Sequence, residues 1–200
     1  AEKGLIAAGR MPNTEHLDAE NAGCALNRRG FITTDYYLQS SPNSWAIGDV
    51  NGKMLFAHAA SHQGEYVART ILGLEFSPYQ AGPCPYCLHG SMEIMHVGLT
   101  EREAAALGGE ILVSKSLFSS NVISQARGDA SGFVKVVWRN GEMAGIAAIG
   151  GCATQLTLSA ELLLMGQYSG SRLNSFMVAH PTLDETLVDA VKAPRRPSEY

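Results

Sequence analysis

The sequence predicts an α+β fold in which an antiparallel sheet with helices follows a smaller α/β segment. Three observations predict it. Strand-like runs follow one another over residues 110–149, and an apolar stretch long enough for a helix comes next, at residues 152–165. Before them, residues 74–86 are rich in residues that break regular structure, which predicts a linker between the two parts: Pro78, Gly82, Pro83 and Pro85.

The part before the linker is predicted to hold strands and one helix. Strands are expected at Lys3–Ala8, Gly30–Thr34 and Trp45–Val50, because these runs are short and apolar or β-branched. From Phe56 to Leu72 the apolar and small residues recur at helical spacing, and Gly73 supplies a stop.

The part after the linker is predicted to form the antiparallel sheet. Strands are expected at Met92–Gly98, Glu110–Leu117, Gly132–Trp138 and Glu142–Ile149. The Asn140-Gly141 pair between the last two can supply the positive φ angles of a type I′ turn. We therefore expect these two strands to form a hairpin.

Helices are predicted between and after these strands. Thr100 and Glu103 have the spacing of a capping box and open a short helix. A long apolar helix is expected at Cys152–Met165, and two shorter helices are expected on either side of residues 180–182. The tail from Lys192 onward, rich in proline and charge, is expected to be frayed.

Composition and charge exclude several classes. A net charge of −4 gives no electrostatic reason to expect nucleic-acid binding. No apolar run reaches the roughly 18 residues that a membrane span needs, and the first residues do not resemble a signal peptide. Four cysteines are too few for a disulfide scaffold, so we expect a reducing, cytoplasmic setting. Without a membrane span, we expect no membrane partner.

The first candidate site is the Gly48-Asp49 pair at the end of the predicted strand Trp45–Val50. Open α/β sheets bind ligands at the carboxyl ends of strands. Gly48 would let a ligand approach the backbone, and the Asp49 carboxylate would accept hydrogen bonds from sugar-like hydroxyl groups. A common Gly-Asp turn with no ligand is the alternative.

The second candidate site is His180-Pro181-Thr182-Leu183-Asp184-Glu185. Histidine can take and return a proton near neutral pH, and a nearby carboxylate can fix its tautomer. The alternative is structural, since Thr182 and Glu185 also have the spacing of a capping box. The two roles are compatible because a carboxylate has two oxygens.

Both motifs occur in the order and at the separation found in one class of flavoenzymes. On these residues the chain resembles the C-terminal part of the class I pyridine nucleotide–disulfide oxidoreductases. Leu183 after His-Pro-Thr is similar to dihydrolipoamide dehydrogenases more than to glutathione reductases, which usually have serine there. The segments that carry the resemblance are 7–14, 30–35, 45–50, 55–60, 97–101, 132–135 and 180–185.

The resemblance implies a domain organisation. Residues 1–10 would be the tail of an NAD-binding domain, and residues 11–73 the C-terminal half of an FAD-binding α/β domain. After the linker at 74–86, residues 87–200 would form an antiparallel-sheet interface, or dimerisation, domain with helices.

The resemblance also implies an activity for the parent protein. FAD and NAD(P) would be its cofactors, and a disulfide or dithiol such as lipoamide its substrate. The protein would be a homodimer in which His180 completes the partner's active site as acid and base and Glu185 orients it. Asp49 and Gly48 would lie at the FAD ribitol, and the flavin side would be formed by Leu55, Phe56, Ala57 and His58.

The chain departs from the family pattern in several places. Ala59 stands where a lysine is usual, and Met92 stands where a proline is usual. The G-x-G-x-x-G motif and the C-x-x-x-x-C redox pair do not occur in this sequence. We therefore expect this chain alone to be inactive, and cofactor binding by it stays open. The alternative function is a non-catalytic dimerisation module.

Cys84-Pro85-Tyr86-Cys87 is a C-x-x-C motif in the predicted linker. The context is wrong for a thioredoxin-like site, which places the motif at a helix N-terminus after a strand. Free thiols, a redox pair and a metal site that includes His89 and His96 all remain open. We expect no metal at this motif.

Overall fold

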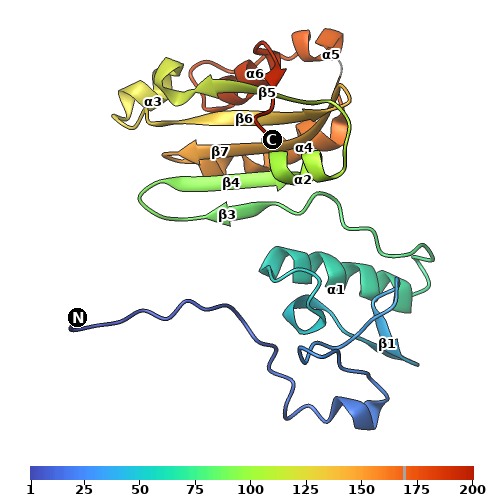
Figure 1. Ribbon diagram of the computed structural model, residues 1–200. Coiled ribbons are helices and arrows are strands. Elements are labelled where there is room, and N and C mark those ends of the chain that lie inside the picture. The colour runs from blue at the N-terminus through green and yellow to red at the C-terminus, as the bar shows by residue number, and fades with distance from the viewer. Residues whose placement is uncertain (169) are drawn as a thin grey trace. The chain divides into compact units, whose positions relative to one another are not determined.

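The computed structural model describes residues 1–168 and 170–200, without the side chains of residues 170 and 171. The chain divides into two compact units, Ala1–Ala81 and Gly82–Tyr200 (Figure 1). The division falls inside residues 74–86, where proline and glycine are frequent.

The first unit is small and has little regular structure. A 3-10 turn at Ala19–Ala22 precedes a short antiparallel hairpin of β1 (Gln39–Ser41) and β2 (Ser44–Trp45). A second 3-10 turn, Gly48–Asn51, leads to helix α1 (Ala57–Ile71). Two small apolar clusters hold these elements together: Ala19, Cys24, Ile32, Ala46 and Val50 in one, and Leu38, Tyr66, Val67, Trp45 and Tyr79 in the other.

Helix α1 confirms the predicted helix. It ends one residue before Leu72, and the N–H of Gly73 donates to the carbonyl oxygen of Thr70 over 3.0 Å. Gly73 has φ of +67°, a conformation that glycine adopts at little cost, so it stops the helix as expected.

The three strands predicted in this unit are largely wrong. Lys3–Ala8 forms no strand, and Leu5 and Ile6 are 94% and 92% exposed. A strand needs a neighbour for its backbone hydrogen bonds, and no described segment pairs with it. Gly30–Thr34 makes a single bridge, between Ile32 and Leu26. The strand predicted at Trp45–Val50 ends at Trp45, because Gly48 at φ +71° turns the chain into a 3-10 turn.

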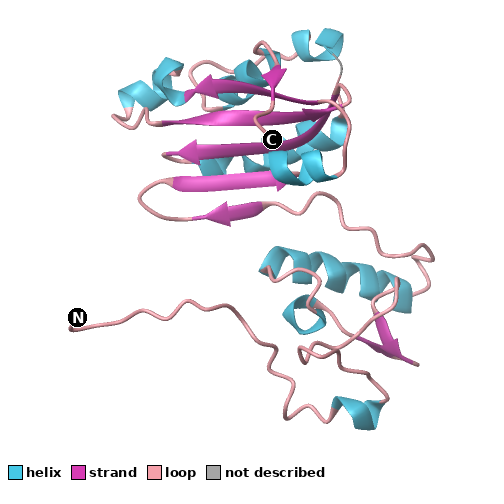
Figure 2. Cartoon of the chain, viewed as in Figure 1, coloured by secondary structure: helices cyan, strands magenta, loops and turns pink. Residues whose placement is uncertain are grey.

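The second unit is built on an antiparallel sheet, as predicted (Figure 2). Its strands lie in the order β3-β4-β7-β6-β5-β8. Asn140 and Gly141 have φ of +51° and +86°, which confirms the hairpin between β6 and β7. The bounds are β3 Tyr86–Leu88, β4 Glu93–Gly98, β5 Ile111–Leu117, β6 Gly132–Arg139, β7 Glu142–Gly150 and β8 Arg196–Pro197.

Helices lie on both faces of this sheet. Helix α4 packs against β4 and β7, and helix α6 packs against β5 and β6. Short helices and 3-10 turns connect the strands and precede α4. The bounds are α2 Glu101–Ala106, η3 Phe118–Ser120, α3 Val122–Ala126, η4 Ala153–Leu156, α4 Thr157–Gly166, α5 Gly170–Asn174 and α6 Asp184–Lys192.

The core of the second unit lies between the sheet and the pair α4 and α6. Val134 and Val136 of β6 are fully buried in it, together with Ile146 of β7 and Leu187 of α6. Side chains alternate along a strand, so Lys135 points to the opposite face, where it pairs with Glu101 of α2. Helices α4 and α6 therefore cover one face of the sheet, and α2 lies on the other.

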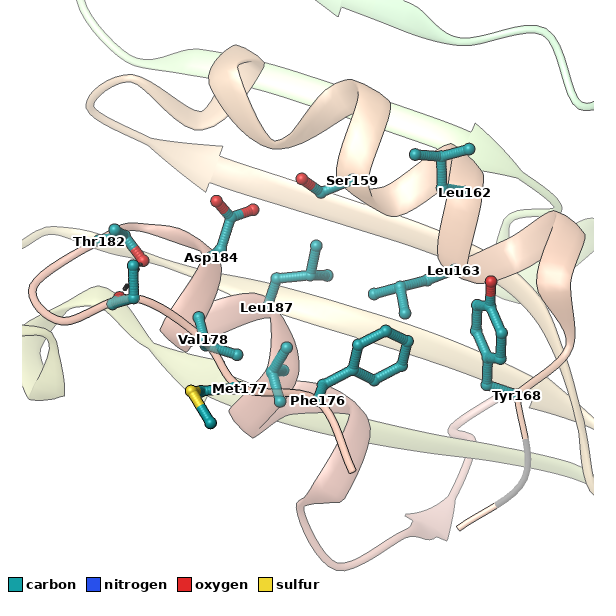
Figure 3. A pocket seen from close by; sticks show the side chains of 12 residues that line it. Ser159, Leu162, Leu163, Tyr168, Phe176, Met177, Val178, Thr182, Asp184 and Leu187 are labelled. Atoms are coloured by element: carbon teal, nitrogen blue, oxygen red, sulfur yellow. Dashed lines mark hydrogen bonds between the residues drawn. The ribbon is translucent and has the colours of Figure 1, made fainter. Parts of the chain in front are cut away.

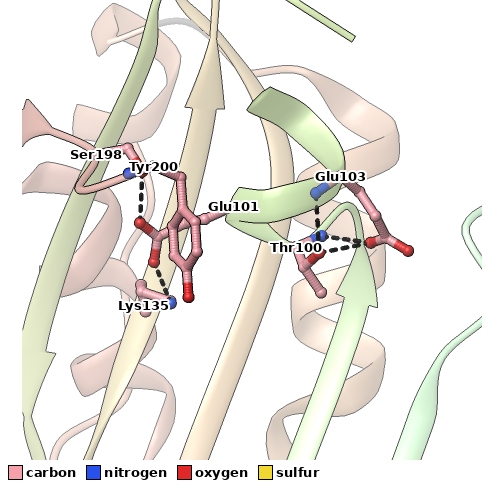
Figure 4. A network of polar contacts seen from close by, with 6 residues as sticks. All are labelled: Thr100, Glu101, Glu103, Lys135, Ser198 and Tyr200. Atoms are coloured by element: carbon pink, nitrogen blue, oxygen red, sulfur yellow. Dashed lines mark hydrogen bonds and ion pairs between the residues drawn. The ribbon is translucent and has the colours of Figure 1, made fainter. Parts of the chain in front are cut away.

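The C-terminal tail is not frayed. Strand β8 pairs with the edge strand β5, and the guanidinium of Arg195 lies 3.5 Å from the centre of the Trp138 ring. The Ser198 hydroxyl donates to Glu101 over 2.7 Å, beside the Glu101–Lys135 ion pair (Figure 4). An edge strand has backbone groups without partners, and the tail uses them.

Candidate active site

The loop between α5 and α6 brings the two predicted catalytic residues together. Nδ1 of His180 lies 2.9 Å from Oε1 of Glu185. The His180 side chain is 64% exposed and the Glu185 side chain 28%. The imidazole is therefore open to a substrate, while the carboxylate is held closer to the protein.

The other oxygen of the carboxylate serves the backbone. Oε2 of Glu185 accepts a hydrogen bond of 2.9 Å from the N–H of Thr182. The Thr182 hydroxyl donates to the carbonyl oxygen of Ala179 over 2.8 Å and does not cap the helix, which begins at Asp184. Only the glutamate half of the predicted capping box forms among these residues, and the same glutamate contacts His180.

The environment favours a charged Glu185. The Thr182 N–H, and after it the His180 side chain, lower the pKa of the Glu185 carboxyl below its ordinary value. An ionised carboxylate can only accept hydrogen bonds, so in the neutral imidazole the proton lies on Nδ1 of His180. This assignment leaves Nε2 able to accept a proton.

A mainly apolar cavity of about 370 Å³ lies beside this loop, between α4, α6 and residues 176–179 (Figure 3). Thr182 and Asp184 lie at one end of it, and Tyr168 and Phe176 at the other. Oδ1 of Asp184 is buried without a partner among the described residues. The remaining residues around it are Ser159, Leu162, Leu163, Met177, Val178, Ala179, Leu187 and Val188.

The Gly48-Asp49 candidate lies at the start of a 3-10 turn rather than at a strand end. Oδ2 of Asp49 lies 3.6 Å from the guanidinium of Arg10, and the Asp49 side chain is more than half exposed. The N–H of Gly48 donates to Oε1 of Gln63 over 2.8 Å. The same Gln63 oxygen accepts from the Asn51 side chain, so a buried amide pair braces the turn.

Residues 55–58 lie at the start of α1. The Leu55 carbonyl oxygen accepts a hydrogen bond of 3.1 Å from Arg10, the residue that also pairs with Asp49. The rings of Phe56 and His58 stack with their centres 5.2 Å apart, and Ala57 is the first residue of the helix. The first turn of α1 carries no acidic residue, so the positive end of its dipole is not neutralised there.

Sequence reasoning missed three residues that brace these sites. Gln63 and Asn51 hold the turn at Gly48, and Asn121 donates to the carbonyl oxygen of Thr182. Each is a polar residue that becomes buried through contacts with distant parts of the chain. For Gln63 the sequence offered one signal, a polar residue at helical spacing among the apolar and small residues of the predicted helix. For Asn121 it offered none.

The C-x-x-C motif shows no metal-site geometry. Sγ of Cys87 lies 3.3 Å from the Thr157 hydroxyl of α4. Burial raises the pKa of the Cys84 thiol, and the Glu161 carboxylate raises it further. Within the described part of the chain, no three His, Cys, Asp or Glu side chains are placed to hold a metal ion together. Across residues 1–168 and 170–200, no helix is both long enough and apolar enough to cross a bilayer.

Comparisons with known proteins match both units. Residues 84–191 match the family described as pyridine nucleotide-disulphide oxidoreductase, dimerisation domain, and residues 1–64 match the one described as pyridine nucleotide-disulphide oxidoreductase. Dihydrolipoyl dehydrogenase of Synechocystis is 37% identical over 201 residues, which cover 94% of this chain and 42% of that protein. Dihydrolipoyl dehydrogenase of Bacillus subtilis is 32% identical and is covered to 41%.

A solved structure agrees with these matches. The HOCl-induced flavoprotein disulfide reductase RclA from Escherichia coli superposes with a TM-score of 0.82 at 27% identity, over 94% of this chain and 44% of that one. The chain thus spans about two fifths of the length of the proteins that it matches.

Proposed function

We propose, from the premise that this chain belongs to the pyridine nucleotide-disulphide oxidoreductases, that it carries the proton-transfer pair of a dihydrolipoyl dehydrogenase-like flavoprotein disulfide reductase. The observation that carries the proposal is the 2.9 Å contact between His180 Nδ1 and Glu185 Oε1 in an exposed loop. If Glu185 served only to cap the helix, its bond to the Thr182 N–H would be enough, and its other oxygen would not need to contact the exposed imidazole of His180.

The proton transfer follows from the geometry of the pair. Nε2 of His180 accepts the proton of a substrate thiol, and the thiolate attacks one sulfur of a disulfide while the other sulfur leaves as a thiolate. Glu185 stays ionised, holds the imidazole in one tautomer and stabilises the imidazolium. In the reverse direction the imidazolium returns the proton to a thiolate.

We assign the cofactors FAD and NAD(P) to the whole protein. The family description names a pyridine nucleotide and a disulfide, and the RclA structure is described as a flavoprotein. A bound flavin would exchange hydride with the nucleotide and electrons with the redox disulfide. The residues of the first unit fit such a group, because Asp49 offers exposed acceptor oxygens for hydroxyl groups and the start of α1 offers a positive dipole end.

We also propose the domain assignment that the resemblance implies. Residues 1–10 belong to the NAD-binding domain, residues 11–73 to the FAD-binding domain, and residues 87–200 to the dimerisation domain after the linker 74–86. The substrate is a disulfide or dithiol of the lipoamide type, the protein works as a cytoplasmic homodimer, and this chain alone does not turn over. Its sequence contains no C-x-x-x-x-C pair to be reduced.

The experiment that tests the function uses the whole protein. His180→Gln should slow the reaction of the substrate dithiol with the enzyme strongly and spare flavin reduction by NADH, measured separately by stopped-flow absorbance. Glu185→Gln should give a milder loss, since it removes orientation and charge but not the base. An unchanged dithiol reaction in His180→Gln would contradict the assignment.

A second candidate is favoured by one observation, the absence of the redox pair from this sequence. In that case the chain acts only as a dimerisation module. An absorbance scan of the purified chain separates the two, because bound flavin gives a yellow protein, whereas the module is colourless.

A further inference from the structure

A buried asparagine reaches the catalytic loop from a distant part of the chain. The side-chain amide Nδ2 of Asn121 donates a hydrogen bond of 2.8 Å to the carbonyl oxygen of Thr182, 61 residues later in the sequence. Asn121 is only 5% exposed. It therefore connects the interior of the second unit to the loop that carries His180 and Glu185.

Asn121 is itself held on a rigid base. Its backbone N–H donates to the carbonyl oxygen of Phe118 over 3.0 Å, and the Phe118 side chain is fully buried in the core. Its Oδ1 accepts from the N–H of Ser124 and so caps helix α3. The cap uses only Oδ1 of the Asn121 side chain, so Nδ2 is available to donate to Thr182.

Thr182 is the residue on which the active-site contacts converge. Its N–H donates to Oε2 of Glu185, and its hydroxyl donates to the carbonyl oxygen of Ala179. These bonds join residues of the loop to one another. The bond from Asn121 connects the loop to another part of the unit. Asn121 binds the carbonyl oxygen of the peptide group between Thr182 and Leu183, whereas Glu185 binds the N–H of the peptide group between Pro181 and Thr182.

We propose that Asn121 is a positioning residue for the His180–Glu185 pair. By fixing the carbonyl side of Thr182, it aims the Thr182 N–H at Glu185, and this holds the carboxylate in place beside the imidazole. Asn121 does not touch His180 and acts through Thr182 and Glu185. The importance of this role for turnover rests on the proposed function, but the positioning itself does not.

The variant Asn121→Ser separates positioning from capping. Serine is also a favoured N-cap, so its hydroxyl can keep the bond to the N–H of Ser124, but it is too short to reach Thr182 and has no amide to donate. Ser124→Ala is the matched control, because it changes a side chain that contacts Asn121 in the same cap and leaves the amide nitrogen untouched.

The test is NMR on the 200-residue chain, with titration of the Glu185 carboxyl carbon and hydrogen exchange of the Thr182 amide. In Asn121→Ser the pKa of Glu185 should rise toward its ordinary value, because the Thr182 N–H is the first cause of its lowering. The Thr182 amide should exchange roughly tenfold faster, the factor that one net hydrogen bond supplies. Ser124→Ala should change neither.

An unchanged Glu185 pKa and an unchanged Thr182 exchange rate in folded Asn121→Ser would overturn the proposal, even if the melting temperature falls. If Asn121→Ser does not fold, the proposal is tested on the unmodified chain by hydrogen exchange of the Asn121 side chain. The side-chain amide hydrogens of Asn121 should then exchange slowly, and exchange as fast as in an exposed asparagine would overturn it. None of these measurements needs flavin or substrate, so their failure is distinguishable from a failure of the His180→Gln kinetics.

Discussion

Replacing Leu162 by glutamate should weaken self-association of the chain. Helix α4 is apolar on two sides, since Leu163 and Leu164 are buried in the core while an outer stripe stays exposed. The stripe consists of Leu158, Leu162 and Met165, at 65%, 56% and 61% exposure, spaced four and three residues apart. A helix that is apolar all round is expected to be covered on both sides.

The size of the effect follows from the exposed area. Burying a whole leucine side chain is worth about 1.5–3 kcal/mol, so the 56% of Leu162 that is exposed is worth about 0.8–1.7 kcal/mol. A two-fold interface uses the residue twice, which gives about 2–3 kcal/mol per dimer. The dissociation constant should therefore rise by roughly 30- to 150-fold, and burying two carboxylates would raise it further.

Sedimentation velocity over a wide concentration range measures this change. Leu107→Glu is the control, because Leu107 is 59% exposed and follows α2 on the other face of the sheet. The control should associate like the unmodified chain. Equal weakening by both substitutions, or none by Leu162→Glu, would refute the reasoning that the α4 stripe is the interface.

Three further predictions concern stability. Deleting residues 195–200 removes a cation–π contact, a charged hydrogen bond and a short strand, together about 1–3 kcal/mol, and should lower the melting temperature of the second unit by about 4–12 °C in calorimetry. Gly132→Ala should prevent folding, seen as loss of dispersed NMR signals, because its Cβ would overlap the carbonyl oxygen of Ile149; Gly128→Ala, with open space around it, should fold. Glu185 has a lowered pKa, so its contribution to stability is present above its ordinary value of 4.5 and is lost as pH falls through the folded pKa. In urea titrations Glu185→Gln should therefore lose stability relative to the unmodified chain at neutral pH but not in acid.

Local signals in the sequence were sufficient where partners are close along the chain. The Asn140-Gly141 turn, helix α1 and the Thr100–Glu103 capping box were all predicted and are confirmed. His180 and Glu185 could be paired for the same reason, since only five positions along the chain separate them. Their catalytic role stays a prediction.

Predictions failed where a structure depends on a distant partner. An apolar run such as Lys3–Ala8 has strand propensity, but no segment among the described residues pairs with it, so it forms no strand. The tail failed in the opposite way. Its proline and charge predict disorder, yet β5, about 80 residues earlier in the chain, offers an open edge for it.

The sequence by itself therefore determined the family, the antiparallel sheet of the second unit and the histidine–glutamate motif, because these are written in short patterns of residues. Only the tertiary structure decided what supports the motif. It divides the two oxygens of Glu185 between His180 and Thr182, and it brings Asn121 onto Thr182 from 61 residues away. Such contacts depend on how the sheet and helices pack, and polar side chains acquire these tasks only once packing has buried them.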